Sequence, residues 1–155
     1  MKTETLILTN LIKNEEFMRK VLPFLKADYL AEFHEKTLFE EIKSHVLNYN
    51  SRPPISALKI SLESSNKITE NNLSKCLEVL QEIETTEPES RIDWLVDISE
   101  KFCQEKAIYN AIMDSISILD GVDLNRGKGS IPNLLSDALA VSFDTNIGHD
   151  YINDA

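Results

Sequence analysis

No glycine or proline interrupts the chain between Ser90 and Asp120, where the sequence reads SRIDWLVDISEKFCQEKAIYNAIMDSISILD. Residues that favour helix dominate this stretch, which predicts a single helix of about 30 residues, roughly 45 Å long. Apolar side chains recur in alternating steps of three and four, as on a helix with one buried side. This first stripe comprises Leu95, Ile98, Phe102, Tyr109, Ile112, Ile116 and Leu119. Glu105 is the one position of the repeat that is not apolar. A second stripe holds Val96, Cys103, Ala107, Ala111 and Ile118.

A second, shorter helix is predicted to return along the first. Gly121 is a predicted C-cap, residues 125–129 form a loop, and Ser130 with Pro132 begins the next helix. Its apolar residues are Ile131, Leu134, Leu135, Ala138, Leu139, Val141 and Phe143. The return helix can cover one stripe of the long helix but not both. The remainder must be covered by the rest of the chain or by a second copy, and exposed apolar seams favour association.

The residues before this hairpin predict several small helices. Apolar periodicity and breaks place them at 3–13, from Asn14 to near Pro23, at 35–49, from Ser56 through Leu62, and at 69–84. In the third of these we expect Leu38, Phe39, Ile42, Val46 and Tyr49 to be buried. The predicted class is therefore all-α: a small globular helical head over residues 1–88, a long helical hairpin over 89–143, and a short tail over 144–155 that we interpret as a linker.

Composition and charge exclude several classes of protein. The 155 residues are 42% hydrophobic and 27% charged, which is not the composition of a disordered chain. The formal net charge of −10 argues against strong autonomous DNA binding, which needs a basic surface. Cys76 and Cys103 are expected to be buried and inert. With no apolar run of about 20 residues and no signal-peptide pattern, we expect no membrane association.

No catalytic constellation can be assembled from the sequence. The segment from Gly127 to Ser130 resembles part of a phosphate-binding loop, but Lys128 is followed by glycine and a helix, not a strand, precedes it. His34, His45 and His149 lack ligand-type spacing, and no Glu-x-x-His motif occurs. Adjacent glutamates such as Glu15 and Glu16 point in different directions on a helix, so we expect them to lie on solvent-exposed faces and not to form an acid/base pair. We therefore expect no catalytic residue, no bound metal and no cofactor in this chain.

A collinear set of segments resembles the N-terminal region of DnaB-type replicative helicases of T-even-like bacteriophages. It comprises 6–12 (LILTNLI), 21–23 (VLP), 27–30 (ADYL), 39–46 (FEEIKSHV), 54–58 (PISAL), 139–144 (LAVSFD) and 148–150 (GHD). The last two are the most specific, because apolar helices resemble one another. In this family the N-terminal domains pair through their hairpins into a trimer-of-dimers collar on a hexameric ring, and the collar engages primase.

The resemblance also implies roles for individual residues. Self-association would fall on Phe102, Tyr109, Ile112, Met113 and Ile116 of the long helix and on Leu134, Leu135 and Leu139 of its partner. The role of a linker that packs on a neighbouring motor would fall on Phe143, Asp144, His149, Asp150 and Tyr151. A purely intramolecular core remains the alternative for the aliphatic set, and simple C-terminal packing for Phe143 and Tyr151.

The expected function is that of a non-catalytic collar domain that mediates subunit association and docks primase or a helicase loader. The resemblance implies a dimer or trimer of dimers, single-stranded DNA held by the full-length ring, and the cytoplasm of the infected bacterial host. ATP and Mg²⁺ are implied only for the absent motor domain. The alternative is a stand-alone acidic helical adaptor or helicase loader. A phosphate-binding loop encoded further downstream would distinguish the helicase from that alternative.

Overall fold

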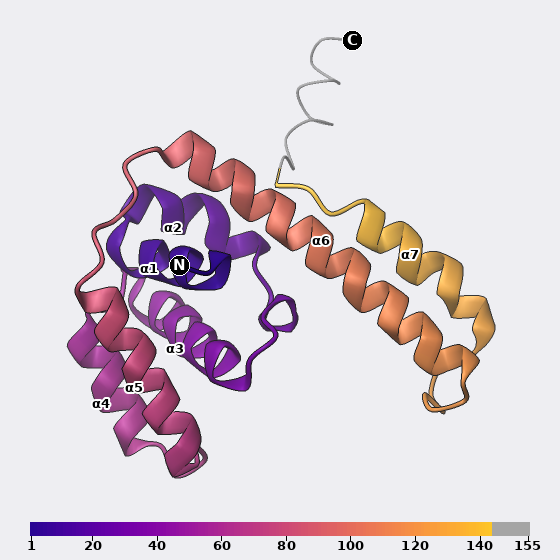
Figure 1. Cartoon of the computed structure of the whole chain (residues 1–155), viewed down its shortest axis with the longest axis horizontal. Helices are drawn as coiled ribbons and strands as arrows, with labels where there is room; N and C mark the ends of the chain where they lie inside the picture. Colours follow the sequence, from indigo (N-terminus) through magenta and orange to yellow (C-terminus); the bar gives the residue numbers. More distant parts are fainter. Residues whose placement is uncertain (144–155) are drawn as a thin grey trace. The chain divides into compact units, whose positions relative to one another are not determined.

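The computed structural model describes residues 1–143, and these residues divide into two compact units. Unit 1 is Met1–Ser99, and unit 2 begins at Glu100. The predicted all-α class is confirmed, since residues 1–143 form helices joined by turns and contain no strand (Figure 1). The α-helices are α1 (Thr3–Lys13), α2 (Glu15–Val21), α3 (Phe33–Tyr49), α4 (Ile55–Ser64), α5 (Glu70–Glu84), α6 (Ile92–Leu119) and α7 (Ile131–Leu139). Three short 3-10 helices are η1 (Leu22–Phe24), η2 (Ala27–Tyr29) and η3 (Lys128–Ser130).

Unit 1 has a core that its own helices supply. Helices α1, α3 and α5 pack against one another, and α4 packs on α3 and α5. Side chains from all of these helices are almost fully buried, among them Leu11, Leu38, Ile42, Leu58 and Leu80. Burying a large apolar side chain stabilises a fold by about 1.5–3 kcal/mol, so these side chains are the main stabilising contribution within unit 1.

Local capping fixes two helix starts in unit 1. The side chain of Asn14 accepts a hydrogen bond from the backbone N–H of Phe17 at 3.1 Å, as its predicted role at the start of α2 requires. Thr69 likewise accepts from the N–H of Asn72 at the start of α5. These caps satisfy N–H groups that have no partner inside the helix.

Two sequence expectations for unit 1 are wrong. Tyr49 was expected in the core, but it is 68% exposed at the end of α3, where its ring lies 4.7 Å from that of His45. Ser56 was expected to cap α4, but the helix begins at Ile55 with Pro54 in the capping position. Helical periodicity shows which side a residue lies on, not whether another element covers that side.

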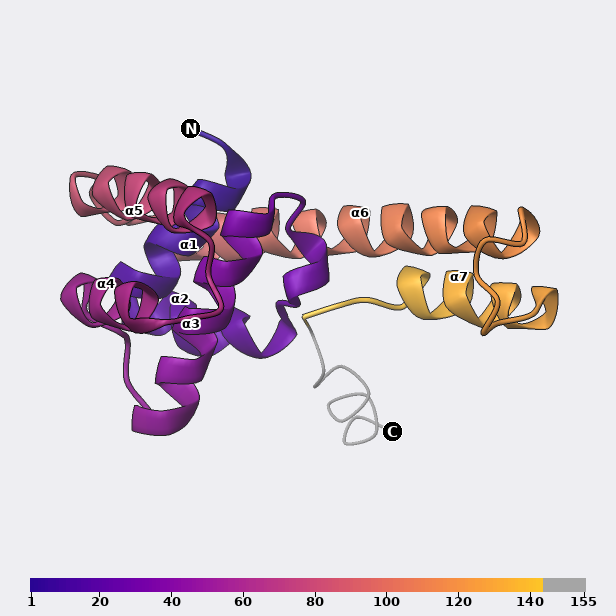
Figure 2. The same ribbon diagram turned by 90° about the horizontal axis from the view of Figure 1, so that it is seen from below.

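Helix α6 runs from unit 1 into unit 2, because the units part between Ser99 and Glu100. The sequence boundary at 88/89 follows the change in composition instead. Within unit 2, α7 lies beside the second half of α6 in both views (Figures 1 and 2). The predicted helical hairpin is therefore present.

Gly121 ends α6, as predicted. It adopts a left-handed φ of 74°, and the N–H groups of Gly121 and Val122 donate to the carbonyl oxygens of Ile118 and Ser117. This pair of hydrogen bonds is a Schellman motif, in which glycine avoids the strain that a side chain would bring. Helix α7 is shorter than expected, however. It ends at Leu139, so Val141 and Phe143 lie beyond it in a non-helical return segment.

None of the helices within residues 1–143 combines the length and apolar composition that a membrane span requires.

Candidate interaction surface

An exposed apolar face on α6 is the candidate functional surface of unit 2. Tyr109 is 59% exposed, and Ile112, Met113 and Ile116 are each 45% exposed. Their spacing of three, one and three places all four on one side of a helix with 3.6 residues per turn. We call these four residues the open stripe.

The opposite side of the same helix segment is buried. Ala111, Ser115 and Ile118 are 6%, 8% and 5% exposed, and we call these three residues the covered stripe. At about 100° per residue, its centre lies roughly 140° around the helix from the centre of the open stripe. Helix α7, whose Ala138 is also buried, lies beside this part of α6.

Hydrogen bonds hold the return segment after α7 against α6. The side-chain amide of Gln104 donates to the carbonyl oxygen of Val141 at 3.0 Å. The carboxylate of Glu100 accepts from the backbone N–H of Phe143 at 2.7 Å and from the Ser142 hydroxyl at 3.3 Å. Because Gln104 lies on the same side of α6 as the covered stripe, these bonds keep the return segment away from the open stripe.

Charged side chains brace the loop at the other end of the hairpin. Arg126 donates to Asp123 at 2.8 Å and lies 3.7 Å from the carboxylate of Asp114 on α6. The hydrogen bond from Arg126 lowers the pKa of Asp123 below its ordinary value. In the same loop Val122 and Leu124 are 75% and 89% exposed. Helical periodicity could not identify these two exposed apolar side chains, since a loop has no helical repeat.

The structure places the predicted association residues in three kinds of environment. The four residues of the open stripe and Leu139, at 73%, are exposed, whereas Leu134 and Leu135 on α7 are half-buried. Phe102 is only 8% exposed, with the Lys106 ammonium 5.7 Å from its ring. The structure thus brings the open stripe together as one surface and leaves Phe102 outside it.

The predicted linker falls mostly outside the described residues. Phe143 is half-buried and held by Glu100, as above. Asp144, His149, Asp150 and Tyr151 lie beyond residue 143. Their role as a linker stays a prediction.

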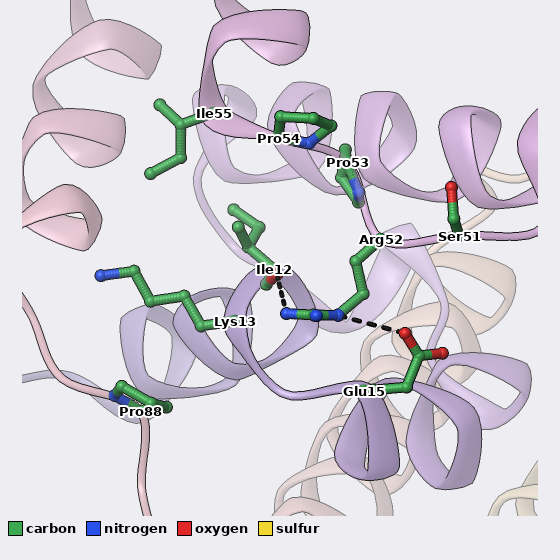
Figure 3. Close-up of a pocket in the computed structure, with 9 residues that line it drawn as sticks. All are labelled: Ile12, Lys13, Glu15, Ser51, Arg52, Pro53, Pro54, Ile55 and Pro88. Atoms are coloured by element: carbon green, nitrogen blue, oxygen red, sulfur yellow. Dashed lines mark hydrogen bonds and ion pairs between the residues drawn. The ribbon is translucent and has the colours of Figure 1, made fainter.

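A pocket of about 570 Å³ in unit 1 is the alternative candidate site (Figure 3). Its cations already have structural partners. The Arg52 guanidinium donates to the carbonyl oxygen of Ile12 and to the Glu15 carboxylate, and the Lys13 ammonium donates to the carbonyl oxygens of Glu84 and Thr86. These bonds join α1 to the segment before α4 and to the end of α5. The cations of the pocket therefore stabilise the fold of unit 1 and are not free to bind a ligand.

The remaining polar groups of residues 1–143 form no evident chemical site. No group of three His, Cys, Asp or Glu side chains is placed there to hold a metal ion. The segment from Gly127 to Ser130 forms the loop and the short helix η3 that lead into α7, in a part of the chain without a preceding strand. The exposed apolar surface is therefore the candidate functional feature of unit 2.

Comparison with known proteins agrees with the sequence resemblance. No family model matches the chain. The chain is 35% identical to the DnaB-like replicative helicase of Enterobacteria phage T4 over 157 aligned residues, which cover 96% of this chain. The predicted resemblance to phage helicases of the DnaB type is thereby confirmed over nearly the whole sequence. The chain spans about a third of the length of this relative, 32%, a share consistent with an N-terminal domain.

Proposed function

We propose that this chain is the non-catalytic N-terminal collar domain of a hexameric phage replicative DNA helicase. In this role unit 2 joins subunits, and the domain offers a docking surface for primase or a helicase loader in the cytoplasm of the infected host. The observation that carries the proposal is the open stripe, in which four large apolar side chains face away from α7. The similarity to a replicative helicase supplies the context.

The mechanism follows from the hydrophobic effect and from tethering. Two open stripes facing each other would remove Tyr109, Ile112, Met113 and Ile116 from water, which favours association in proportion to the apolar area buried. Each collar domain would carry one motor, so pairing of the collars raises the effective concentration of neighbouring motors and favours ring closure. Single-stranded DNA would then be held by the full-length ring, in keeping with the net charge of −10 on this chain.

The chain's own residues do not fit the ATP and Mg²⁺ that such a helicase requires. Lys128 lies in a loop after a helix and is followed by glycine, whereas a phosphate-binding loop follows a strand and has Ser or Thr after its lysine. We therefore assign ATP hydrolysis to a motor domain elsewhere in the parent protein and expect background ATPase activity from this chain.

Sedimentation of the 155-residue chain over a concentration series tests the association. We expect the wild-type chain to form dimers or larger oligomers as concentration rises, and Ile112→Asp to remain monomeric, because the aspartate would have to lose its hydration at the interface. Ile60→Asp is the matched control, since Ile60 is 65% exposed on α4 of unit 1. Circular dichroism confirms that both variants remain folded.

Two results would contradict the proposal. One is a wild-type chain that stays monomeric at every soluble concentration and also when fused to its motor. The other is a weakening of association by Ile60→Asp that equals the effect of Ile112→Asp, which would move the interface away from the open stripe.

A further inference from the structure

An apolar groove in unit 1 lies between α3 and the segment formed by α2 and η1. Its volume is about 280 Å³. Its lining is mainly apolar, with two cationic side chains, and consists of Met18, Arg19, Leu22, Pro23, Lys43, Val46 and Leu47. Met18, Leu22 and Val46 are buried and form its floor, whereas Leu47 is 74% exposed at its edge.

A second hollow lies on the other side of Leu47. It has a volume of about 370 Å³ and shares Lys43 and Leu47 with the groove. Leu47 is therefore a ridge with a hollow on each side, a shape that can fit between the side chains of a partner helix. Glu40 lines only this second hollow, so the two cavities differ in charge.

The groove itself is cationic in an acidic chain. No carboxylate lines it. Residues 17–27 along one side contain Arg19, Lys20 and Lys26 without any Asp or Glu, and Arg19 and Lys20 pair with Glu15 and Glu16 one turn earlier in α2. The whole chain has a formal net charge of −10. Because such a chain repels other acidic polypeptides at most of its surface, this groove is a favourable place for one to dock.

The cations of the groove differ in how far they are already neutralised. Arg19 bonds to Glu15 at 2.6 Å and to the side chain and carbonyl oxygen of Asn50, each at 2.7 Å. Lys43 is exposed and takes part in none of the ion pairs within residues 1–143. It is the cation that remains available to a ligand, directly beside the exposed Leu47.

We propose that this groove binds an acidic amphipathic segment of a partner protein, which inserts apolar side chains beside Leu47 and directs a carboxylate to Lys43. This inference deepens the recruitment part of the proposed function and rests on it. A phosphate backbone fits less well, because the floor is apolar and most of the donors of Arg19 are already used. Apolar anchors that fill a groove are how amphipathic helices dock in general.

The test uses two synthetic helical peptides of about 15 residues, or four turns. Both carry leucines on one face, and the other face carries glutamates in one peptide and lysines in the other. Their binding to the full 155-residue chain is measured by fluorescence anisotropy. We expect the glutamate peptide to bind about tenfold more tightly than the lysine peptide, since electrostatic complementarity selects between otherwise equal partners.

Variants at exposed positions connect this binding to the groove. We expect Lys43→Glu to reverse the preference between the two peptides. We expect Leu47→Asp to weaken the binding of the glutamate peptide about tenfold, because the new carboxylate would lose its hydration when the peptide covers it. Ile60→Asp is again the matched control and should leave the affinity unchanged. Leu47 and Ile60 are 74% and 65% exposed, so neither change disturbs a core.

Several outcomes would overturn the inference. They are equal binding of both peptides, no reversal in Lys43→Glu, or tighter binding of an oligothymidylate or of a peptide of residues 144–155 than of the glutamate peptide. Tighter binding of the oligothymidylate would make nucleic acid the occupant of the groove, and tighter binding of the 144–155 peptide would make the chain's own tail the occupant.

Binding of the primase from the same replication system separates this inference from the proposed function. If Leu47→Asp lowers the affinity for primase about tenfold and Ile60→Asp leaves it intact, the result supports both the groove as the binding site and the recruitment role. Primase binding that Leu47→Asp leaves unchanged rejects the groove and keeps the recruitment role. If primase and the loader do not bind the wild-type chain at all, the recruitment role fails. The inference, which rests on that role, then fails as well, although the peptide measurements would still describe the groove.

Discussion

Units 1 and 2 are both helical, yet they are held together in different ways. The largest fully buried side chains of residues 1–143, such as Phe17, Phe39 and Leu80, all belong to unit 1. In unit 2 the buried set is mostly small, with Cys103, Ala111, Ser115 and Ala138 among its members, while the larger residues of the open stripe are exposed. Unit 1 thus buries its large apolar side chains in its own core, and unit 2 leaves most of its own exposed.

This difference has a consequence for the stability of each unit. A small hairpin that buries few apolar side chains gains little free energy from its own packing, and a partner can supply the rest. We therefore expect the stability of unit 2 to depend on association, and that of unit 1 to be independent of it.

Truncation of a core side chain should have the largest effect. We expect Phe17→Ala to lower the free energy of unfolding by about 3–5 kcal/mol, because Phe17 is fully buried and leaves a cavity. Ile112→Ala should change it by less than about 1 kcal/mol in dilute solution, because that side chain is 45% exposed. Urea denaturation followed by circular dichroism measures both. If both variants lost similar amounts of unfolding free energy, Phe17 as a core residue would not differ from Ile112 as a surface residue, which would contradict the comparison.

Thiol labelling sharpens the comparison between the units. Burial raises the pKa of Cys76 to about 11 and that of Cys103 to about 12, so neither thiol should react near neutral pH until its surroundings open. Because unit 2 has the smaller core, we expect Cys103 to react at least about tenfold faster than Cys76 despite its higher pKa. Mass spectrometry of the single variants Cys76→Ser and Cys103→Ser follows each rate. Faster labelling of Cys76 would show that unit 1 is the less stable part.

A smaller effect is expected at the N-terminus of unit 1. The Lys2 ammonium lies 2.8 Å from the Glu35 carboxylate, which is 1% exposed and whose other oxygen has no hydrogen-bond partner in the described part of the chain. Lys2→Met should cost about 1 kcal/mol, a value kept low because Lys2 is itself 57% exposed. Unfolding free energies of the two proteins give this difference.

The pH dependence of that difference has a definite sign. The hydrogen bond to Glu35 raises the pKa of Lys2 above its ordinary value of 10.5. The stabilisation is therefore fully present below pH 10.5 and is lost as the pH rises through the higher pKa of the folded state. A difference between wild type and Lys2→Met that is constant across this range would contradict the ion pair.

Sequence patterns predicted those features whose causes are local. Asn14 caps α2, and Gly121 ends α6, because each acts on backbone groups within a few residues of itself. The long helix followed from the absence of glycine and proline over residues 90–120. The side of α6 on which Tyr109, Ile112 and Ile116 lie followed in the same way from helical periodicity.

Features that depend on distant partners could not be predicted in this way. Glu35 is a carboxylate on a helix, which a sequence pattern assigns to solvent, yet Lys2 and the surrounding fold keep it buried. Nothing near Leu47 in the sequence shows that α2 and η1 form a groove beside it.

The amino-acid sequence alone determined the helices, most of their ends and the existence of two apolar stripes on α6, because these depend on backbone hydrogen bonding and on a repeat of 3.6 residues. Only the tertiary structure decided that the stripe containing Ala111 is covered and that the one containing Ile112 is open from Tyr109 onward, although Leu95 and Phe102 of the same stripe are buried. It also decided that α7 stops at Leu139, so that the return segment can bond to Gln104 and Glu100. The physical reason is that burial and pairing are properties of two surfaces, and a local pattern describes only one of them.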